Sequence, residues 1–450
     1  MRKAAFHNLG CKVNAYETEA MEQMLEAAGY EIVPFAPGAD VYVINTCSVT
    51  NIADRKSRQM LHRAKKMNPE AVVVAAGCYV QAAGRELAEK DEAVDIVIGN
   101  DRKKELVQIL DRYFQEKTTG EEPEDVYLKD LVSPTEYEEL HISRVEEHTR
   151  AFIKVQDGCN QFCSYCIIPY TRGRIRSRRM EDVEEEVRGL AKKGYQEVVL
   201  TGIHLSSYGL DFKDGTDLLA LIRRIHQVDG IKRIRFGSLE PRIITDEFAK
   251  ALSELPKVCP HFHLSLQSGC DDVLKRMNRH YTCEEYEERC QILRRYFEQP
   301  AITTDVIVGF PGETDEEFRQ TKEFLKTIRF YEMHVFKYSR RAGTRADRMP
   351  DQVPEPVKTE RSAELLSLEA EMSREYRSTF LGKTEEILLE EPVEINGQRY
   401  MIGHTKEYVK GAVLLGKREP EDLKNTFVSG ILKNFLTDEI IFLAESGKVG

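Results

Sequence analysis

The chain has 450 residues, of which 41% are hydrophobic and 31% charged, and its net charge is −11. These values predict a globular protein of two or three domains with more than one core. They exclude a uniformly basic nucleic-acid coat, although a local basic groove remains compatible with them. No apolar run approaches the ~18–20 residues of a membrane helix, so we expect no membrane partner.

The amino terminus and the cysteines indicate the compartment. The opening residues, MRKAAFHNLGC, lack the apolar stretch of about 7–15 residues found in a signal peptide, which predicts a cytoplasmic protein. Ten cysteines in a reducing compartment favour metal binding or catalysis over disulfides.

Residues 1–115 alternate between strand and helix patterns. Apolar, strand-like runs cover residues 3–9, 41–47, 72–78 and 94–99, and helical stretches separate them. Near-continuous Val/Ile runs of this kind are typical of a parallel sheet that is covered on both faces. We therefore predict an N-terminal α/β domain over residues 1–115.

Residues 116–147 differ in composition. Eleven acidic residues stand against three basic ones, and Pro123 and Pro134 lie among them. This composition predicts a solvated acidic linker with one short strand around residues 126–128.

Residues 148–376 contain six further strand patterns, with helical stretches between most of them. The candidates are residues 151–158, 197–202, 233–239, 261–267, 303–310 and 332–338. Six βα units favour a whole or partial β/α barrel over an open sheet. Residues 377–445 then hold five short strand candidates separated by Gly or Pro, which predicts a small β-barrel. The predicted fold class is α/β with a C-terminal β-barrel.

One group of cysteines, the later trio, has the spacing of a metal site. Cys159, Cys163 and Cys166 form a C-x3-C-x2-C pattern in the stretch GCNQFCSYC, directly after a predicted strand. Thiolates are the usual ligands of iron–sulfur clusters, and three of them on a four-iron cluster leave one iron open for a small molecule. The alternatives are a zinc site that lacks one ligand and three unrelated thiols. The spacing and the aromatic residue before the third cysteine favour the cluster.

Three other cysteines, the early trio, are far apart in sequence but share a structural position. Cys11, Cys47 and Cys78 each end a predicted strand. Because the carboxyl ends of parallel strands meet at one edge of a sheet, we expect the three thiols to converge. Taken singly, each cysteine is better explained as a small buried apolar residue. Taken together, they favour a second three-thiolate cluster that faces the first across one cavity.

The pattern of the later trio resembles that of the radical S-adenosylmethionine (SAM) superfamily. Together with NLGCKVNAYE, INTCSVT, AAGCYVQ and the terminal barrel, it makes the whole chain resemble a methylthiotransferase. The resemblance implies an N-terminal cluster domain, a radical SAM domain and a TRAM domain. It also implies two 4Fe-4S clusters, one on each trio, and SAM as the source of both the methyl group and the radical.

Five positions are candidates for contacts with SAM. Thr201 and Gly202 follow a strand where members of the superfamily contact the methionine end of the cofactor. Glu240, Gln267 and Asp305 lie at predicted strand ends that face the mouth of the barrel. The alternative for each of these three residues is a strand-terminal polar group with local hydrogen bonds. The stretch TGIHLSSYG carries no acidic residue where the superfamily pattern has one.

Five arginines follow the later trio within eight residues. In an extended segment, the alternation at positions 172, 174, 176 and 178 would direct them along one edge, which predicts a strip that contacts RNA phosphates. The alternative is a solvated basic segment, or one paired with the acidic linker. A basic helix over residues 55–66 would extend the same groove. The five are Arg172, Arg174, Arg176, Arg178 and Arg179.

The stretch GCKVNAYE around Cys11 resembles the branch of the family that acts on N6-threonylcarbamoyladenosine next to the anticodon, at position 37 of tRNA. The implied reaction adds a methylthio group to C2 of that base. Two alternatives keep the chemistry but act on N6-isopentenyladenosine of tRNA or on an aspartate of a ribosomal protein. A third alternative is a non-catalytic iron–sulfur sensor that binds RNA. The implied partners are tRNA, a flavodoxin- or ferredoxin-like electron donor and a sulfur source.

Overall fold

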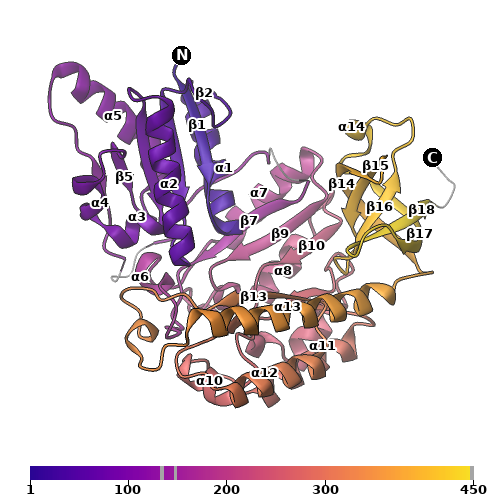
Figure 1. Ribbon diagram of the computed structural model, residues 1–450. Coiled ribbons are helices and arrows are strands. Elements are labelled where there is room, and N and C mark those ends of the chain that lie inside the picture. Colours follow the sequence, from indigo (N-terminus) through magenta and orange to yellow (C-terminus); the bar gives the residue numbers. More distant parts are fainter. Residues whose placement is uncertain (132–135, 146–148, 446–450) are drawn as a thin grey trace.

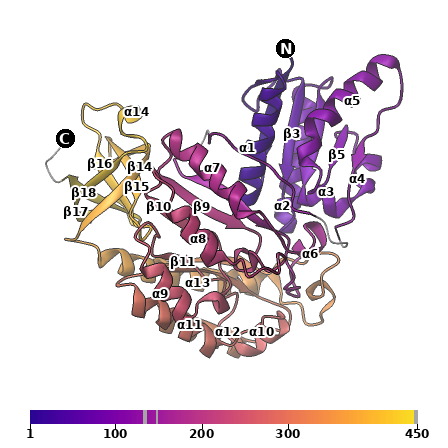
Figure 2. The same cartoon turned by 180° about the vertical axis from the view of Figure 1, so that it is seen from behind.

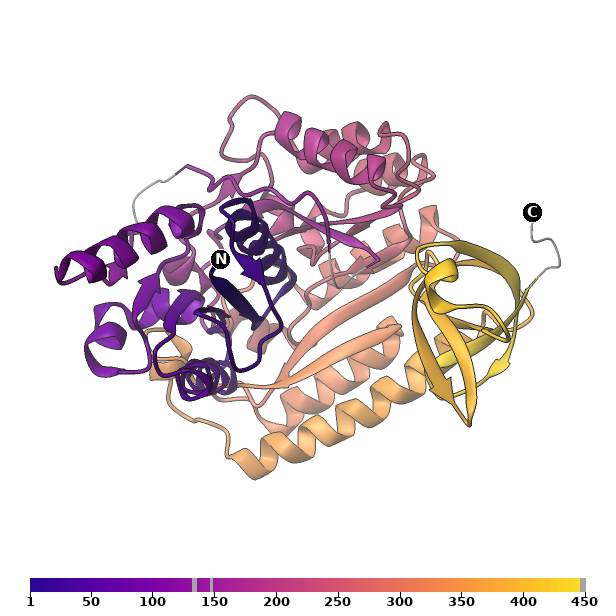
Figure 3. The ribbon, with the colours of Figure 1, turned by 90° about the horizontal axis from the view of Figure 1, so that it is seen from above.

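A computed structural model of the protein describes residues 1–131, 136–145 and 149–445. Three units follow one another along the chain, coloured indigo to purple, magenta to orange, and yellow in Figure 1. The N-terminal domain and the C-terminal barrel stand at opposite ends of the central domain and on the same side of it, as the two opposite views show (Figures 1 and 2). Figure 3 looks onto that side, where long central strands lie between the two flanking units.

The N-terminal domain is built on a six-stranded parallel sheet with the order β2-β1-β3-β4-β5-β6. Its strands are β1 (Lys3–Asn8), β2 (Glu31–Ile32), β3 (Val41–Thr46), β4 (Val72–Gly77), β5 (Ile96–Ile98) and β6 (Val126–Tyr127). Its helices are α1 (Lys12–Ala27), α2 (Asn51–Met67), α3 (Cys78–Ala83), α4 (Arg85–Lys90) and α5 (Leu106–Thr119). Every residue of β3 and β4 is buried between two apolar cores, one on each face. The predicted sheet covered on both faces is confirmed.

The predicted linker is structured over much of its described length. β6 lies within it and pairs with β5 as the last strand of the N-terminal sheet. Leu140 and Ile142 are buried in the apolar core of the central domain. The expectation of a solvated connector is therefore wrong for this segment, because the apolar residues between the acidic ones anchor it. Residues 132–135 and 146–148 lie outside the described residues, so the domain boundary at residue 148 stays a prediction.

The central domain is an open half-barrel. Six parallel strands follow one another in the order β7-β9-β10-β11-β12-β13, and parallel bridges between residues 234 and 258 and between 239 and 264 join its two sheets. The strands are β7 (Ala151–Asp157), β9 (Glu197–Gly202), β10 (Arg233–Phe236), β11 (His261–His263), β12 (Ala301–Val308) and β13 (Glu332–Lys337), with the short antiparallel β8 (Arg176–Ser177) beside β7. The partial barrel predicted from the sequence is confirmed.

Helices cover the outer face of this half-barrel. They are α7 (Met180–Lys192), α8 (Leu218–His226), α9 (Asp246–Ser253), α10 (Asp271–Arg276), α11 (Cys283–Tyr296), α12 (Asp315–Ile328) and α13 (Glu355–Ser378). The short α6 (Ile168–Thr171) instead lies against α3 of the N-terminal domain. On β12, Ile302, Val306 and Val308 pack into the apolar core beneath the helices. Because side chains alternate along a strand, Thr303 and Asp305 point to the opposite, open face.

The C-terminal unit is a closed five-stranded barrel with the order β14-β15-β16-β18-β17, as predicted. Its elements are β14 (Thr384–Ile395), β15 (Gln398–His404), β16 (Lys410–Leu414), α14 (Pro420–Leu423), β17 (Phe427–Phe435) and β18 (Ile440–Glu445). The end of α13 attaches it, since Tyr376 and Phe380 pack into the core of the barrel. Within the described ranges, no helix has the length and apolar character needed to cross a bilayer.

Candidate functional site

The structure brings the early trio to one edge of the N-terminal sheet. Cys11, Cys47 and Cys78 follow β1, β3 and β4, which are neighbours in the sheet. The three thiols lie close enough to interact electrostatically with one another. Burial raises the pKa of Cys11, and it raises the pKa of Cys47 to about 11. A metal that binds Cys47 must therefore displace its proton.

Two glycines allow the chain to pass close to the early trio. Gly10 has a φ of +118°, and a Cβ atom there would lie 3.0 Å from Cβ and 3.1 Å from Sγ of Cys47. Gly77 has a φ of +98°, and a Cβ atom there would lie 2.6 Å from Asn45 Oδ1. Only glycine fits both the left-handed backbone and the space at these positions.

A buried network of charges lies directly beside Cys78. Arg172 Nε donates to Cys78 Sγ at 3.3 Å, and Arg172 Nη1 donates to Glu17 Oε1 at 2.8 Å. Glu17 is also paired with Lys103 at 2.9 Å and with Lys154 at 2.7 Å. Glu17 and Lys103 belong to the N-terminal domain, whereas Lys154 and Arg172 belong to the central domain. The network therefore joins the two domains at the early trio.

Counted over the described residues, this ion network has four cations and three carboxylates. Its cations hold the pKa of Glu17 well below the usual range, although burial alone would raise it. Glu138 lies nearby, and burial raises its pKa to about 7, so it is only partly ionised at neutral pH. The excess positive charge beside Cys78 fits an anionic, thiolate-bound group at the early trio. The four cations and three carboxylates are Lys103, Lys154, Arg172, Arg176, Glu17, Asp101 and Asp157.

The later trio lies in the loop between β7 and α6. Its three cysteines line a cavity of about 140 Å³, together with Tyr165 and side chains that follow β9, β10 and β11. Gly158 has a φ of +71°, and a Cβ atom there would lie 1.8 Å from the carbonyl oxygen of Arg174. Burial raises the pKa of Cys159 to about 11 and that of Cys166 to about 12.

Arg279 is a cavity residue that the sequence did not reveal. Its Nη1 donates to Cys163 Sγ at 3.4 Å, and its Nη2 donates to the carbonyl oxygen of Ser265 at 3.0 Å. Burial alone would lower the pKa of Arg279, but Tyr281, Tyr165 and Cys163 together raise it, so a cation faces the trio. No local signal points to this residue, because it lies 116 positions after Cys163.

His204 is a second unpredicted cavity residue, although it belongs to the TGIHLSSYG stretch already singled out. Its backbone N–H donates to Gln156 Oε1 at 2.7 Å, and its Nδ1 is hydrogen-bonded to Ser207 Oγ at 2.6 Å. Burial, reinforced by Arg279 and Arg242, lowers the pKa of His204 to about 4. The ring is therefore neutral at physiological pH.

The five predicted SAM contacts separate into three groups. Glu240 and Gln267 line the cavity of the later trio, and Gln267 has the strained φ of +75° that often marks functional positions. Thr201 and Gly202 end β9 directly before Ile203 and His204, two residues that line the cavity. Asp305 is not among the lining residues of this cavity, since its carboxylate lies 3.3 Å from His263 Nε2.

Comparison with known proteins identifies the family. The model of the "Radical SAM superfamily" matches residues 153–325, and that of "Uncharacterized protein family UPF0004" matches residues 3–99. The chain is 44% identical over 411 residues to the threonylcarbamoyladenosine tRNA methylthiotransferase MtaB of Bacillus subtilis (strain 168), covering 91% of this chain and 90% of the relative. The chain belongs to the methylthiotransferase family of radical SAM proteins. Membership implies a 4Fe-4S cluster and SAM as cofactors.

Other relatives of this methylthiotransferase carry two different substrate names. The MtaB protein of Thermotoga maritima is 38% identical over 452 residues, which covers 100% of this chain and 96% of the relative. The tRNA-2-methylthio-N(6)-dimethylallyladenosine synthase of Thermoanaerobacter sp. (strain X514) is 38% identical, covering 85% of this chain and 80% of the relative. Among solved structures, the radical SAM methyltransferase TsrM from Kitasatospora setae shares the fold, with a TM-score of 0.56, 17% identity and 77% of each chain covered.

The sulfur spacing of both trios is compatible with iron–sulfur clusters. A zinc ion bound by three thiolates would draw the sulfur atoms to within about 3.8 Å of one another. Where the chain is described, only His263, Asp305 and His334 bring three His, Cys, Asp or Glu ligand atoms within 4.8 Å of one another. The wider spacing of both trios fits clusters in which each thiolate binds a different iron.

The predicted phosphate strip is wrong for three of its five arginines. Arg172, Arg176 and Arg178 are buried, and a buried guanidinium cannot reach a phosphate. The first two belong to the ion network, and Arg178 is paired with Glu186 and Glu139.

The burial of these arginines has a clear physical cause. Helix α1 of the N-terminal domain carries polar residues on its inner face, including Tyr16, whose hydroxyl donates to Glu186 at 2.9 Å. This face covers the arginine segment and pairs with it. Arg174 and Arg179 remain exposed, and the Arg174 guanidinium lies 4.8 Å from the centre of the Phe162 ring. For these two arginines, RNA binding stays a prediction.

Proposed function

We propose that this methylthiotransferase adds a methylthio group to C2 of N6-threonylcarbamoyladenosine at position 37 of tRNA. The proposal rests on the presence of both cysteine trios in this chain. It also rests on the similarity of the chain to threonylcarbamoyladenosine tRNA methylthiotransferases, which are 38–44% identical to it. The relatives named for dimethylallyladenosine are 37–38% identical, so they lie at or below the lower end of that range. Both groups of relatives are named for a tRNA nucleoside, which favours tRNA over a ribosomal protein as the substrate.

The later trio would hold the 4Fe-4S cluster whose open iron binds SAM. When bound, such a cluster supplies the electron that splits SAM and releases a carbon-centred radical. The residues of this chain orient the cofactor: Glu240 and Gln267 offer acceptors and donors in the cavity, and the neutral His204 offers a further hydrogen bond without adding charge. Arg279 donates to Cys163 Sγ and so places a cation beside the later trio.

The early trio would hold the second 4Fe-4S cluster, which carries sulfur to the substrate. Support comes from the convergence of the three thiols and from the excess positive charge beside Cys78. The ion network keeps the N-terminal domain docked, so that the early trio remains beside the radical domain. An electron donor of the flavodoxin or ferredoxin type and a separate sulfur source complete the reaction, and we place the protein in the cytoplasm with its tRNA.

Anaerobic reconstitution tests the proposal. The protein would be loaded with iron and sulfide, reduced, and mixed with SAM and tRNA that carries either threonylcarbamoyladenosine or isopentenyladenosine. Mass spectrometry of the digested nucleosides should show a methylthio product only from the first tRNA. A methylthio product from the second tRNA would instead identify isopentenyladenosine as the substrate. Release of 5′-deoxyadenosine without any RNA product, together with methylthiolation of a ribosomal protein, would overturn it.

A further inference from the structure

Lys12 lies where the three units of the chain come close to one another. Lys12 is the first residue of α1, directly after Cys11 of the early trio, and its side chain is accessible. The Lys12 ammonium interacts electrostatically with Tyr408 of the C-terminal barrel and with Arg150, Arg235 and Asp305 of the half-barrel. Lys12 of the N-terminal domain therefore lies near the open face of the half-barrel and near the C-terminal barrel.

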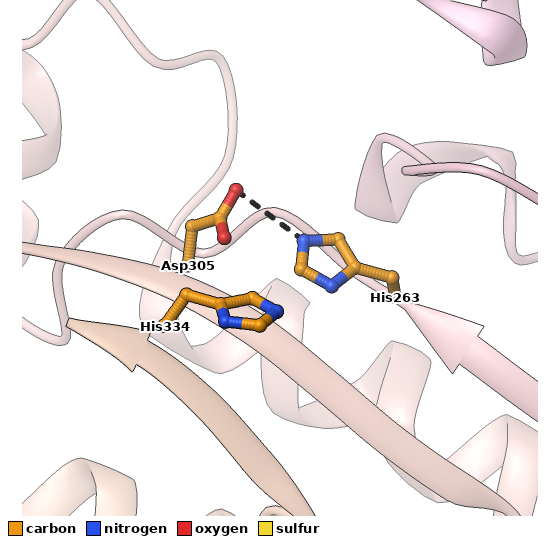
Figure 4. A group of neighbouring side chains, drawn as sticks. All are labelled: His263, Asp305 and His334. Atoms are coloured by element: carbon orange, nitrogen blue, oxygen red, sulfur yellow. Dashed lines mark ion pairs between the residues drawn. The ribbon is translucent and has the colours of Figure 1, made fainter. Parts of the chain in front are cut away.

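Three side chains from neighbouring strands lie close together on the open face of the half-barrel (Figure 4). His263, Asp305 and His334 come from β11, β12 and β13, and Asp305 and His334 are direct partners in the parallel register. His263 Nε2 lies 3.3 Å from Asp305 Oδ2, while His263 Nδ1 is hydrogen-bonded to Thr303 Oγ1 at 3.1 Å. The facing ligand atoms of all three side chains lie within 4.8 Å of one another.

The polar cluster of Lys12, His263, Asp305 and His334 has free bonding capacity. Within the described residues, the Lys12 ammonium and the His334 imidazole form no ion pair or hydrogen bond. Arg150 and Arg235, by contrast, are already paired with Glu390 at 3.2 Å and with Glu197 at 2.7 Å. The free donors therefore come from Lys12 and His334, and the free acceptor capacity comes from Asp305, whose side chain is 28% exposed.

We propose that this cluster is the subsite that recognises the amino-acid part of the substituent on the target adenosine. Lys12 and His334 bind the carboxylate, and the Asp305–His263 pair accepts and donates a hydrogen bond at the hydroxyl. The proposal rests on the proposed function and names the residues that set its substrate choice. An apolar dimethylallyl group would leave the same polar groups desolvated and unpaired, which is how a polar subsite rejects an apolar analogue.

A divalent metal is the competing occupant, since two imidazoles and a carboxylate are common metal ligands. The position of Lys12 disfavours it, because the ammonium interacts with the same carboxylate that would have to bind the ion. A carboxylate-bearing ligand is attracted by the same charge.

Binding of short anticodon stem-loop RNAs to the reconstituted protein tests the subsite. Three RNAs would differ only at the target base, which carries threonylcarbamoyl, isopentenyl or no substituent. Fluorescence anisotropy should show that the wild type prefers the threonylcarbamoyl RNA over the unmodified RNA by about tenfold or more. Lys12→Met and His334→Phe should each reduce this preference to about threefold or less, with the affinity for unmodified RNA unchanged. Lys104→Met, on the exposed surface of the same domain, should keep the full preference.

Two outcomes would overturn the inference. One is a wild type that methylthiolates threonylcarbamoyl tRNA, together with variants that retain its full preference in binding. The other is one equivalent of zinc or manganese in the purified protein that His263→Ala removes while the preference is retained. Failure of the proposed function is distinguishable, because a wild type that makes no product from this tRNA would fail before any variant is compared.

Discussion

The two cysteine trios are encoded in different ways. The later trio lies within eight residues, so the closing of a single loop sets the positions of its thiols. The early trio spans residues 11–78 and converges only because β1, β3 and β4 are neighbours in a parallel sheet. A local motif therefore builds one site, and the topology of a whole domain builds the other.

The surroundings of the trios differ as much as their encoding. The later trio borders a cavity of about 140 Å³ that is also lined by the cation of Arg279. The early trio borders the ion network that joins the N-terminal domain to the central domain. SAM chemistry therefore depends on a loop and a cavity, whereas the second site depends on domain docking.

The largest expected effect separates the trios by function. Cys163→Ala should abolish release of 5′-deoxyadenosine, because the cluster that binds SAM would be lost. Cys47→Ala should retain that release and lose only the methylthio product. Each variant should contain about four irons per chain instead of about eight, as measured by iron analysis of the reconstituted protein. Loss of 5′-deoxyadenosine release in Cys47→Ala with four irons retained would mean that the two sites are not independent.

The next effect concerns the docking of the early trio. Arg172→Met should lower the free energy of unfolding by about 3–5 kcal/mol, because it leaves Glu17 and Asp157 buried beside fewer cations. Denaturant unfolding of the iron-free protein measures this change.

Arg179→Met is the matched control for Arg172→Met, because Arg179 belongs to the same segment but is exposed. This control should change the free energy of unfolding by less than about 0.5 kcal/mol. Equal effects of the two substitutions would show that the ion network does not hold the domains together.

Most of the fold could be predicted from periodicity. The buried Val/Ile runs at β3 and β4 and the spacing of the six βα units predict the parallel sheet and the half-barrel, because burial on both faces requires such runs. The linker could not be predicted in the same way. Its acidic composition predicts a solvated segment, although it contains the apolar residues Leu140 and Ile142. These two residues pack against a distant part of the chain, so the sequence around them does not show their burial.

The site residues could be predicted only where they lie close together in sequence or at the carboxyl ends of predicted strands. The spacing of the later trio and the strand-end positions of the early trio both indicate cysteine sites. Arg279 and the subsite on β11 to β13 depend on contacts between distant segments, which no local pattern carries. The arginine segment shows a second limit of sequence-based prediction. Alternation predicts that the arginine side chains point to the same side of the segment. It does not predict whether a helix such as α1 covers that side.

A smaller effect is expected from pH on the early-trio side. Burial raises the pKa of Glu138 to about 7 in the folded protein, so the folded state holds this proton more tightly than the unfolded state. Ionisation of this group therefore costs stability progressively as pH rises from about 4.5 to 7. Glu138→Gln should match the wild type at low pH and exceed it at pH 8 by about 2–3 kcal/mol. Unfolding curves at pH 4.5 and 8 measure the difference, and a constant difference would contradict the prediction.

The smallest effect concerns the exposed arginines beside the later trio. If Arg174 and Arg179 each contact one phosphate, Arg174→Ala and Arg179→Ala should each reduce the slope of log affinity for tRNA against log salt by about 1. Arg295→Ala, an exposed arginine on α11, should leave the slope unchanged. Unchanged slopes in all three variants would mean that cations other than Arg174 and Arg179 contact the tRNA phosphates. The exposed basic residues of α2 would then be the next to test, which would move RNA contact from the later trio to the early one.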